Sequence, residues 1–160
     1  MFKDMELEFF RVFVTESREL IEEVELQLIA THEEAERTGV VDPSGINGVF
    51  RLFHTMKGSA GSLGLNNIAS LTHKAETLLD LFRSGKASLQ SDHVDLLMEA
   101  IDLARGYLDL IDKNNSDKGR EDERESIEKR LSAAIDSANG KPAAAEKPTN
   151  DRNSSENEKR

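Results

Sequence analysis

Residues 66–83, which read NNIASLTHKAETLLDLFR, decide the fold class that the sequence predicts. The apolar residues in this stretch recur at intervals of three and four, at Ile68, Leu71, Ala75, Leu78 and Phe82. In an α-helix this spacing places them on one face and leaves the polar residues on the others. Asn66 or Asn67 can cap the start of this helix, and Ser84-Gly85 is typical of its end. We therefore expect an amphipathic helix that packs through a single stripe.

The same kind of stripe recurs on both sides of this segment and predicts four more helices, over residues 4–37, 43–64, 91–114 and 120–138. The residues expected on their buried faces are, in chain order, Phe9, Phe13, Leu20, Val24, Leu28, Val49, Phe50, Phe53, Met56, Ala60, Leu63, Val94, Leu97, Ile101, Ala104, Leu108, Ile111, Ile127, Leu131, Ala134 and Ile135. Helices joined by short loops bury such stripes most simply as antiparallel neighbours. We predict an all-α fold, an up-down-up-down four-helix bundle with an additional C-terminal fifth helix.

The last part of the chain differs in composition from the rest. From Gly140 it reads GKPAAAEKPTNDRNSSENEKR, which contains no aromatic residue and no Val, Ile, Leu or Met. Such a segment cannot bury enough apolar surface to offset the entropy lost on ordering. The 160 residues suffice for one ordinary domain. We therefore predict one helical domain over residues 1–138 and a disordered tail or interdomain linker over residues 139–160.

The charge balance indicates protein partners. Asp and Glu number 31 against 21 Lys and Arg, a formal net charge of −10, which disfavours binding to nucleic acid or to an anionic membrane. The absence of cysteine excludes disulfides, thiolate metal sites and a cysteine nucleophile. No apolar run approaches the roughly 18 residues of a membrane span, and acids interrupt the N-terminus where a signal peptide has its apolar core. We expect a cytoplasmic domain that is monomeric.

Residues 54–65, HTMKGSAGSLGL, place three glycines next to a histidine in a helical pattern. Glycine inside a helix costs about 1 kcal/mol relative to alanine, so these positions require a reason. Gly58 and Gly61 share a helix face with His54, at the edge of the apolar stripe. They either allow the backbone of a partner to approach the imidazole or let two helices of this chain pack closely, and their shared face with His54 favours the first. Gly64 suits the left-handed conformation that ends a helix.

Two further side chains can complete a reactive site around His54. Lys57, three residues later on the same face, can offset the negative charge of a phosphoryl group. Glu76, which shares a face with His73 on the next helix, can accept the Nδ1–H of His54. That contact would fix the tautomer and leave Nε2 as the nucleophile. The plainer interpretation is that Lys57 and Glu76 are ordinary surface charges.

HTMKGSAGSLGL followed by THKAETLLDLFRSG closely resembles the histidine phosphotransfer (HPt) domain at the N-terminus of CheA-type chemotaxis histidine kinases. The family pattern is H-x-x-K-G-x-x-x-x-x-G on one helix and T-H-x-x-E on the next. The residues that match it are His54, Lys57, Gly58, Gly64, Thr72, His73 and Glu76. The resemblance covers roughly residues 5–135 and includes the acidic, Phe-rich first helix.

The resemblance implies that His54 accepts a phosphoryl group from a kinase catalytic domain and passes it to an aspartate of a response regulator receiver domain. Glu76 would orient His54, and Lys57 and His73 would surround the phosphoryl group. The helix face that Gly58 and Gly61 share with His54 predicts that these two glycines form the docking surface. The chain itself would need no cofactor, because the partner kinase domain binds ATP and Mg²⁺. Consistent with this, the sequence contains no G-x-x-x-x-G-K-[ST] motif and no ATP-binding core.

Three alternatives remain open at this stage. His54, His73 and Glu76 are ligand types for a metal-binding bundle, although the di-iron pattern needs two E-x-x-H motifs and the order here is H-x-x-E, once. The chain can also be a non-catalytic adaptor bundle, with His54 as a core-edge histidine. Finally, it can be a free-standing phosphorelay protein instead of part of a kinase. His32 and His93 match no motif, and we interpret both as surface residues without a role.

Overall fold

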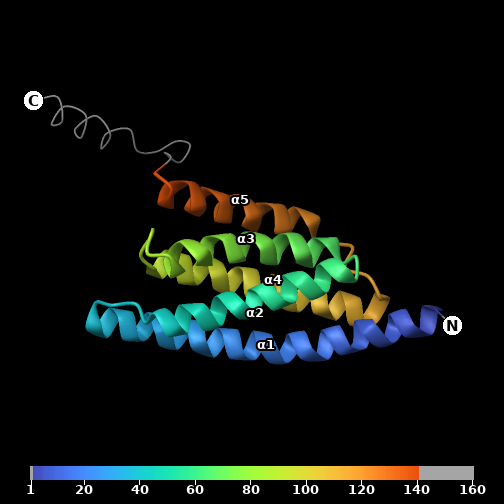
Figure 1. Ribbon diagram of the computed structural model, residues 1–160. Helices are drawn as coiled ribbons and strands as arrows, with labels where there is room; N and C mark the ends of the chain where they lie inside the picture. Colours follow the sequence, from blue (N-terminus) through green and yellow to red (C-terminus); the bar gives the residue numbers. More distant parts are fainter. Residues whose placement is uncertain (1, 141–160) are drawn as a thin grey trace, which may run out of the picture.

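The computed structural model describes residues 2–140, of which five helices make up most (Figure 1). The helices are α1 (Phe2–Thr38), α2 (Pro43–Ser62), α3 (Asn66–Arg83), α4 (Ser91–Asn114) and α5 (Glu121–Ala138). No strand occurs within these residues, so the predicted all-α fold is confirmed. Apart from Asn139 and Gly140, the tail predicted for residues 139–160 lies outside the described residues. The proposed division of the chain at this point therefore stays a prediction.

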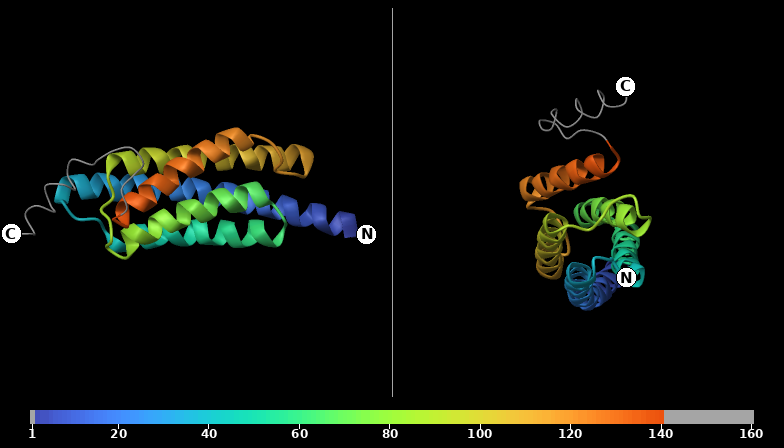
Figure 2. Two further views of the ribbon diagram at one scale, coloured as in Figure 1. Left: turned by 90° about the horizontal axis from the view of Figure 1, so that it is seen from above. Right: turned by 90° about the vertical axis from the view of Figure 1, so that its left-hand side faces the viewer.

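Helices α1 to α4 run alternately up and down around a shared core, and α5 lies outside this bundle (Figure 2). Within the bundle α1 contacts α2 and α4, and α3 contacts the same two helices from the opposite corner. The fifth helix packs against α3 and α4 and buries Ile127 and Leu131. None of the helices between residues 2 and 140 is long and apolar enough to cross a membrane.

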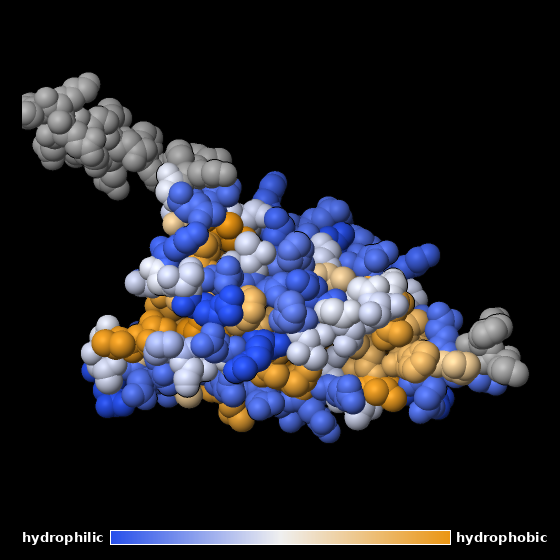
Figure 3. All heavy atoms as spheres, in the orientation of Figure 1, coloured by the Kyte–Doolittle hydropathy of each residue, from blue (hydrophilic) through white to orange (hydrophobic). Residues whose placement is uncertain are grey.

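The predicted stripe of α1 is wrong at Phe9. Phe9 is 54% exposed, whereas its neighbour Phe10 is buried. Leu20 is half-buried and packs against the core beside the buried Ile21, as expected for the stripe. Phe9 and Phe10 lie four and three residues before the buried Phe13, so the spacing fits both, but their side chains point about 100° apart around the helix. As a result Phe9, with Met5 and Val12, forms an exposed apolar surface near the end of the molecule where α1 begins (Figure 3).

The start of α3 is capped from a distant loop, not by its own asparagines as predicted. Leu65 occupies the N-cap position and makes no side-chain hydrogen bond there. The carboxylate of Asp117, in the α4–α5 connection, accepts the Ile68 N–H at 2.9 Å. The side-chain amide of Asn67 donates to the Asp117 backbone carbonyl at 2.8 Å. Because a buried helix end needs partners for its free N–H groups, Asp117 ties the start of α3 to the connection that precedes α5.

Replacing Asp117 with alanine should lower the free energy of unfolding by about 1–2 kcal/mol, because the N–H of Ile68 then loses its buried acceptor. Urea unfolding followed by circular dichroism measures this change. Asp117→Asn retains an acceptor oxygen and should cost less. Equal stability of the alanine variant and the wild-type chain would contradict the capping role.

Candidate functional site

The site forms where α2 and α3 pack side by side. His54 projects from the middle of α2, and its side chain is 60% exposed. Glu76 projects from α3 and is only 9% exposed. The sequence places these two residues on neighbouring helices, and the antiparallel packing brings them together. An exposed imidazole therefore rests on a nearly buried carboxylate.

Both oxygens of Glu76 are engaged by α2. Oε2 is hydrogen-bonded to Nδ1 of His54, and Oε1 accepts a hydrogen bond from Lys57 Nζ at 2.7 Å. With the proton of a neutral imidazole on Nδ1, the lone pair is on Nε2. The arrangement thus favours the tautomer with the lone pair on Nε2. The expected contact between Glu76 and His54 is present, whereas the roles assigned to these residues stay predictions.

The ionisation of Glu76 is set by opposing effects. Burial raises the pKa of the Glu76 carboxyl, but the hydrogen bonds from Lys57 and His54, with the charges of both residues, outweigh it. The net pKa of Glu76 lies below the ordinary value of 4.5. Glu76 is therefore an anion at neutral pH and acts only as an acceptor toward the imidazole and the ammonium.

The lowered pKa of Glu76 makes part of the stability depend on pH. A depressed folded-state pKa means that the unfolded chain binds the proton more tightly, so this contribution is complete above the ordinary glutamate pKa. It is lost as the pH falls from there through the folded-state pKa. We expect the free energy of unfolding to fall as acid is added below about pH 4.5, more steeply in the wild type than in Glu76→Gln. Unfolding in urea between pH 3 and 6 tests this, and equal slopes would contradict it. Glu33→Gln, which removes an exposed carboxylate on α1, is the control.

Gly58 and Gly61 lie on the exposed face of α2 beyond His54. A Cβ atom added at either position would meet no atom within 4 Å. By contrast, a Cβ at Gly45 would come within 2.2 Å of the Thr31 hydroxyl of α1, so that glycine does serve helix packing. Close packing inside the chain therefore does not explain Gly58 or Gly61, and the alternative of partner access remains. Gly64 has φ +74° just after α2 and ends the helix as predicted.

His73 is placed differently from the other predicted site residues. Its side chain is exposed, and within residues 4–140 it forms no hydrogen bond or ion pair. The structure therefore brings together His54, Lys57 and Glu76 but does not tie His73 to them. Lys57 is held by Glu76, so it is not a free surface lysine.

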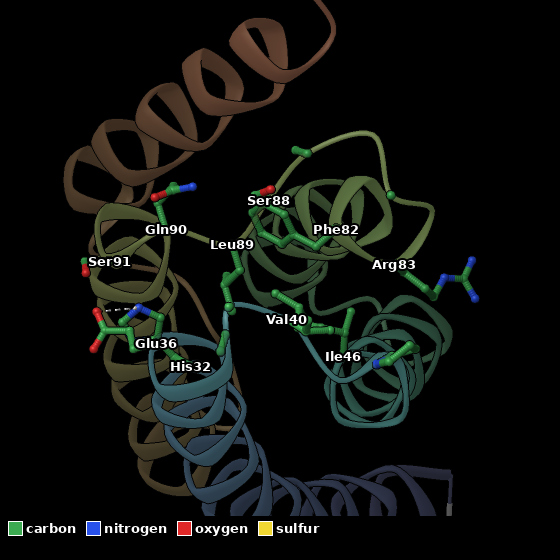
Figure 4. A pocket seen from close by; sticks show the side chains of 16 residues that line it. His32, Glu36, Val40, Ile46, Phe82, Arg83, Ser88, Leu89, Gln90 and Ser91 are labelled. Carbon is green, nitrogen blue, oxygen red and sulfur yellow. Dashed lines mark ion pairs between the residues drawn. The ribbon is translucent and has the colours of Figure 1, made fainter.

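The exposed side chain of His54 lies outside the cavity at the end of the bundle. A cavity of about 630 Å³ lies at one end of the bundle, between the α1–α2 and α3–α4 connections (Figure 4). Its lining includes Val40, Ile46, Phe82 and Leu89, but not His54. Small-molecule sites are usually enclosed, whereas an exposed side chain on a convex helix face suits a macromolecular partner.

Comparison with known proteins supports the resemblance seen in the sequence. The sequence profile of the Hpt domain family matches residues 8–107. The chain belongs to the Hpt domain family. It is 33% identical over 128 residues to the sensor histidine kinase CheAY of Helicobacter pylori, an alignment that covers 79% of the chain and 15% of that protein. It is 27% identical over 145 residues to the chemotaxis protein CheA of Bacillus subtilis, covering 90% of the chain and 21% of that protein.

A solved structure shares the fold of this Hpt domain. It is the phosphorylated P1 domain of CheA3 in complex with CheY6 from R. sphaeroides, with a TM-score of 0.72 and 22% sequence identity. The match covers 82% of this chain and 98% of that one. The chain thus spans a small part of its curated relatives but nearly all of this neighbouring domain. The predicted family and helical-bundle fold are confirmed.

The other two histidines of the Hpt domain are not the plain surface residues that the sequence predicted. Nδ1 of His93 accepts the Gln90 N–H at 3.0 Å in a capping box at the start of α4. Its ring packs against Phe82, and burial lowers the pKa of His93. His32 lies at the cavity, paired with Glu36 at 3.5 Å (Figure 4). Both histidines thus have structural contacts away from the His54 site.

A metal site finds no support in the described residues. Within them, no group of three or more His, Cys, Asp or Glu side chains is arranged to hold a metal ion. The two oxygens of Glu76 are used by His54 and Lys57. The Hpt site therefore differs from a carboxylate-rich metal-binding bundle.

Proposed function

We propose that His54 of this Hpt domain accepts a phosphoryl group from a kinase catalytic domain and passes it to an aspartate of a receiver domain. The observation that carries this proposal is the exposed imidazole whose Nδ1 is held by a nearly buried carboxylate. Such a contact orients a nucleophile without covering it. Membership of the Hpt family and the similarity of the chain to chemotaxis kinases support the same function.

In the first step the Nε2 lone pair of His54 attacks the γ-phosphorus of ATP. The N–P bond forms as the bond from this phosphorus to the bridging oxygen breaks, and ADP leaves with that electron pair. The Nδ1 proton remains on the hydrogen bond to Glu76, whose negative charge offsets the positive charge that develops on the ring. In the second step an aspartate oxygen of the receiver attacks the phosphorus, and the N–P electron pair returns to Nε2.

Lys57 has two functions in this proposal. Its ammonium group holds Oε1 of Glu76, so that Oε2 stays directed at His54. Its side chain is also 31% exposed and lies on the His54 face, where a phosphoryl group would arrive. ATP and Mg²⁺ belong to the kinase domain in this scheme, and the chain binds neither on its own. His73 would contribute only once the phosphoryl group is on His54, so the initial attack does not require it.

We further propose that this domain is part of a larger chemotaxis-type kinase. The chain spans 15% and 21% of the two kinase relatives described above. A flexible connection would give the domain a millimolar effective concentration at its own kinase and leave it free to reach a separate receiver. The neighbouring structure is a phosphorylated domain in complex with CheY6, and this supports a response regulator as the second partner.

Replacing Gly58 or Gly61 with alanine separates stability from docking. Each substitution should raise the free energy of unfolding by up to about 1 kcal/mol, because the added Cβ meets no atom and favours the helix. It should also slow transfer to a receiver, because the methyl group occupies the surface where the partner backbone approaches. Thermal unfolding and transfer kinetics measure the two effects. Variants that are more stable but transfer the phosphoryl group at the wild-type rate would contradict the docking role. Gly45→Ala is the control, because its added Cβ would clash with Thr31 and should destabilise the fold.

The proposal is tested by incubating the chain with a CheA-type kinase core and ³²P-labelled ATP, then adding a receiver domain. We expect acid-labile, alkali-stable label on the chain. After the receiver domain is added, this label should move from the chain to the receiver. The His73→Gln variant should accept label at a similar rate, because His73 does not contact His54. Absence of label with several kinase cores would overturn the relay and favour the adaptor alternative.

A further inference from the structure

Phe50, one helical turn before His54, makes a second contact with the imidazole. The centres of the two rings lie 6.0 Å apart and their planes are 17° from parallel. This separation is within the range of interacting aromatic pairs. The sequence pattern predicted Phe50 in the core stripe, but the residue is only half-buried. Its position on α2 allows it to flank the reactive residue.

Arg83, the last residue of α3, covers Phe50. The central carbon of its guanidinium group lies 3.9 Å from the centre of the phenyl ring, a cation–π contact. Asp80, one turn earlier on α3, holds the same guanidinium at 2.6 Å. Although Arg83 borders the cavity at the end of the bundle, its guanidinium extends away from it (Figure 4). A continuous series of contacts thus leads from Asp80 through Arg83 and Phe50 to His54.

We infer that Phe50 and Arg83 form a second positioning element for the His54 imidazole, separate from Glu76. This inference rests on the proposed function, since it concerns the readiness of Nε2 for attack. Glu76 holds the ring at one atom, and a ring held at one atom can still tilt about that bond. A nearly parallel ring on its flank restricts the tilt, and the guanidinium in turn fixes the phenyl ring. The His54 side chain is 60% exposed, so few protein atoms surround the imidazole and restrict its orientation. The contact with Phe50 supplies part of this restriction.

Arg83 also places a cation near the site, with Asp80 as its counterion. The whole of α2 contains no Asp or Glu, although the chain has a net charge of −10. Lys57 follows His54 by three residues. Phe50, which Arg83 of α3 covers, precedes His54 by four. Cations therefore lie on both sides of His54 along the helix, and each is paired with a carboxylate of α3.

The test is steady-state phosphorylation of the chain by the kinase core, with kcat and KM for the chain measured separately. Arg83→Gln should lower kcat about two- to fivefold with little change in KM, the effect of a cation–π contact at a partly exposed position. Arg83→Lys should restore most of the rate, because an ammonium can also lie over the ring. Phe50→Leu should match Arg83→Gln, and the double variant should lose no more than either single one, since the two residues act as a unit.

Arg130→Gln is the control for net charge. Arg130 lies on α5, where both of its terminal nitrogens pair with Glu99 at 2.7 Å, and the variant should keep wild-type kinetics. Thermal unfolding shows whether Phe50→Leu is folded; if it is not, the comparison of Arg83→Gln with Arg83→Lys decides. Wild-type kcat in Arg83→Gln, or effects that multiply in the double variant, would overturn the inference while leaving the relay intact. Failure to label the wild-type chain would instead remove the proposed function itself.

Discussion

Replacing His54 with glutamine is expected to abolish phosphorylation of the chain by a CheA-type kinase core. The amide nitrogen of glutamine has no available lone pair, so nothing at this position can form the N–P bond. The bundle should be unaffected, because the side chain is 60% exposed and lies outside the core. The measurement is the rate of label transfer from ATP, with a loss below the detection limit as the expected result.

His73→Gln and His32→Gln serve as matched controls, since each removes one of the four histidines and leaves His54 in place. Both should be labelled at nearly the wild-type rate. Unchanged labelling of His54→Gln would move the acceptor elsewhere. In that case the exposed His73 would be the next residue to replace.

The second large effect is expected from Glu76→Gln, which should slow phosphorylation of His54 about 10- to 100-fold, the loss expected for a hydrogen bond to a charged group. The carboxylate offers one oxygen to His54 and the other to Lys57. Glutamine has a single oxygen for these two donors, so either the imidazole or the ammonium loses its acceptor. The remaining amide group is itself a donor, and facing Nδ1 it would favour the tautomer with the proton on Nε2. Rates of label transfer under single-turnover conditions measure the effect.

Glu76→Asp distinguishes orientation from charge at this position. The shorter side chain keeps the negative charge but draws it back from His54, so the rate should fall in this variant too. Circular dichroism should show that all these variants remain helical, because Lys57 can reach solvent when unpaired. Wild-type rates in both Glu76 variants would show that the imidazole does not depend on this carboxylate.

The helices could be predicted because their signals are local. Apolar residues at intervals of three and four, with Pro43 at the start of α2 and Gly64 after its end, set the type and extent of the elements. The errors arose where tertiary structure decides. Nothing in the local pattern distinguishes Phe9 from Phe10, since the choice depends on which face of α1 meets the other helices. The cap on α3 comes from Asp117, which is 49 residues away from Ile68 in the sequence. A local sequence pattern cannot predict a contact over this separation.

The residues at the centre of the site could also be predicted from the sequence. His54 and Lys57 share a helix face, and the resemblance to the Hpt family pointed to Glu76 as their partner. The contact of Arg83 with Phe50 was not predicted, because it joins α3 to α2 and depends on the packing of two helices. An aromatic residue four positions before the histidine was the only local signal. The same holds for His93, whose capping role depends on Gln90 being the N-cap residue of α4, one position before the predicted start of the helix.

The most direct test of the central claim is nuclear magnetic resonance of the chain with ¹⁵N-labelled histidine, before and after phosphorylation. Four histidines give a spectrum that single substitutions can assign. Before phosphorylation, we expect His54 to show the proton on Nδ1 and a free Nε2. Afterwards, the phosphorus should couple to Nε2 of His54, while the Nδ1 proton remains. A phosphoryl group on Nδ1 of His54, or on any other histidine, would contradict the account.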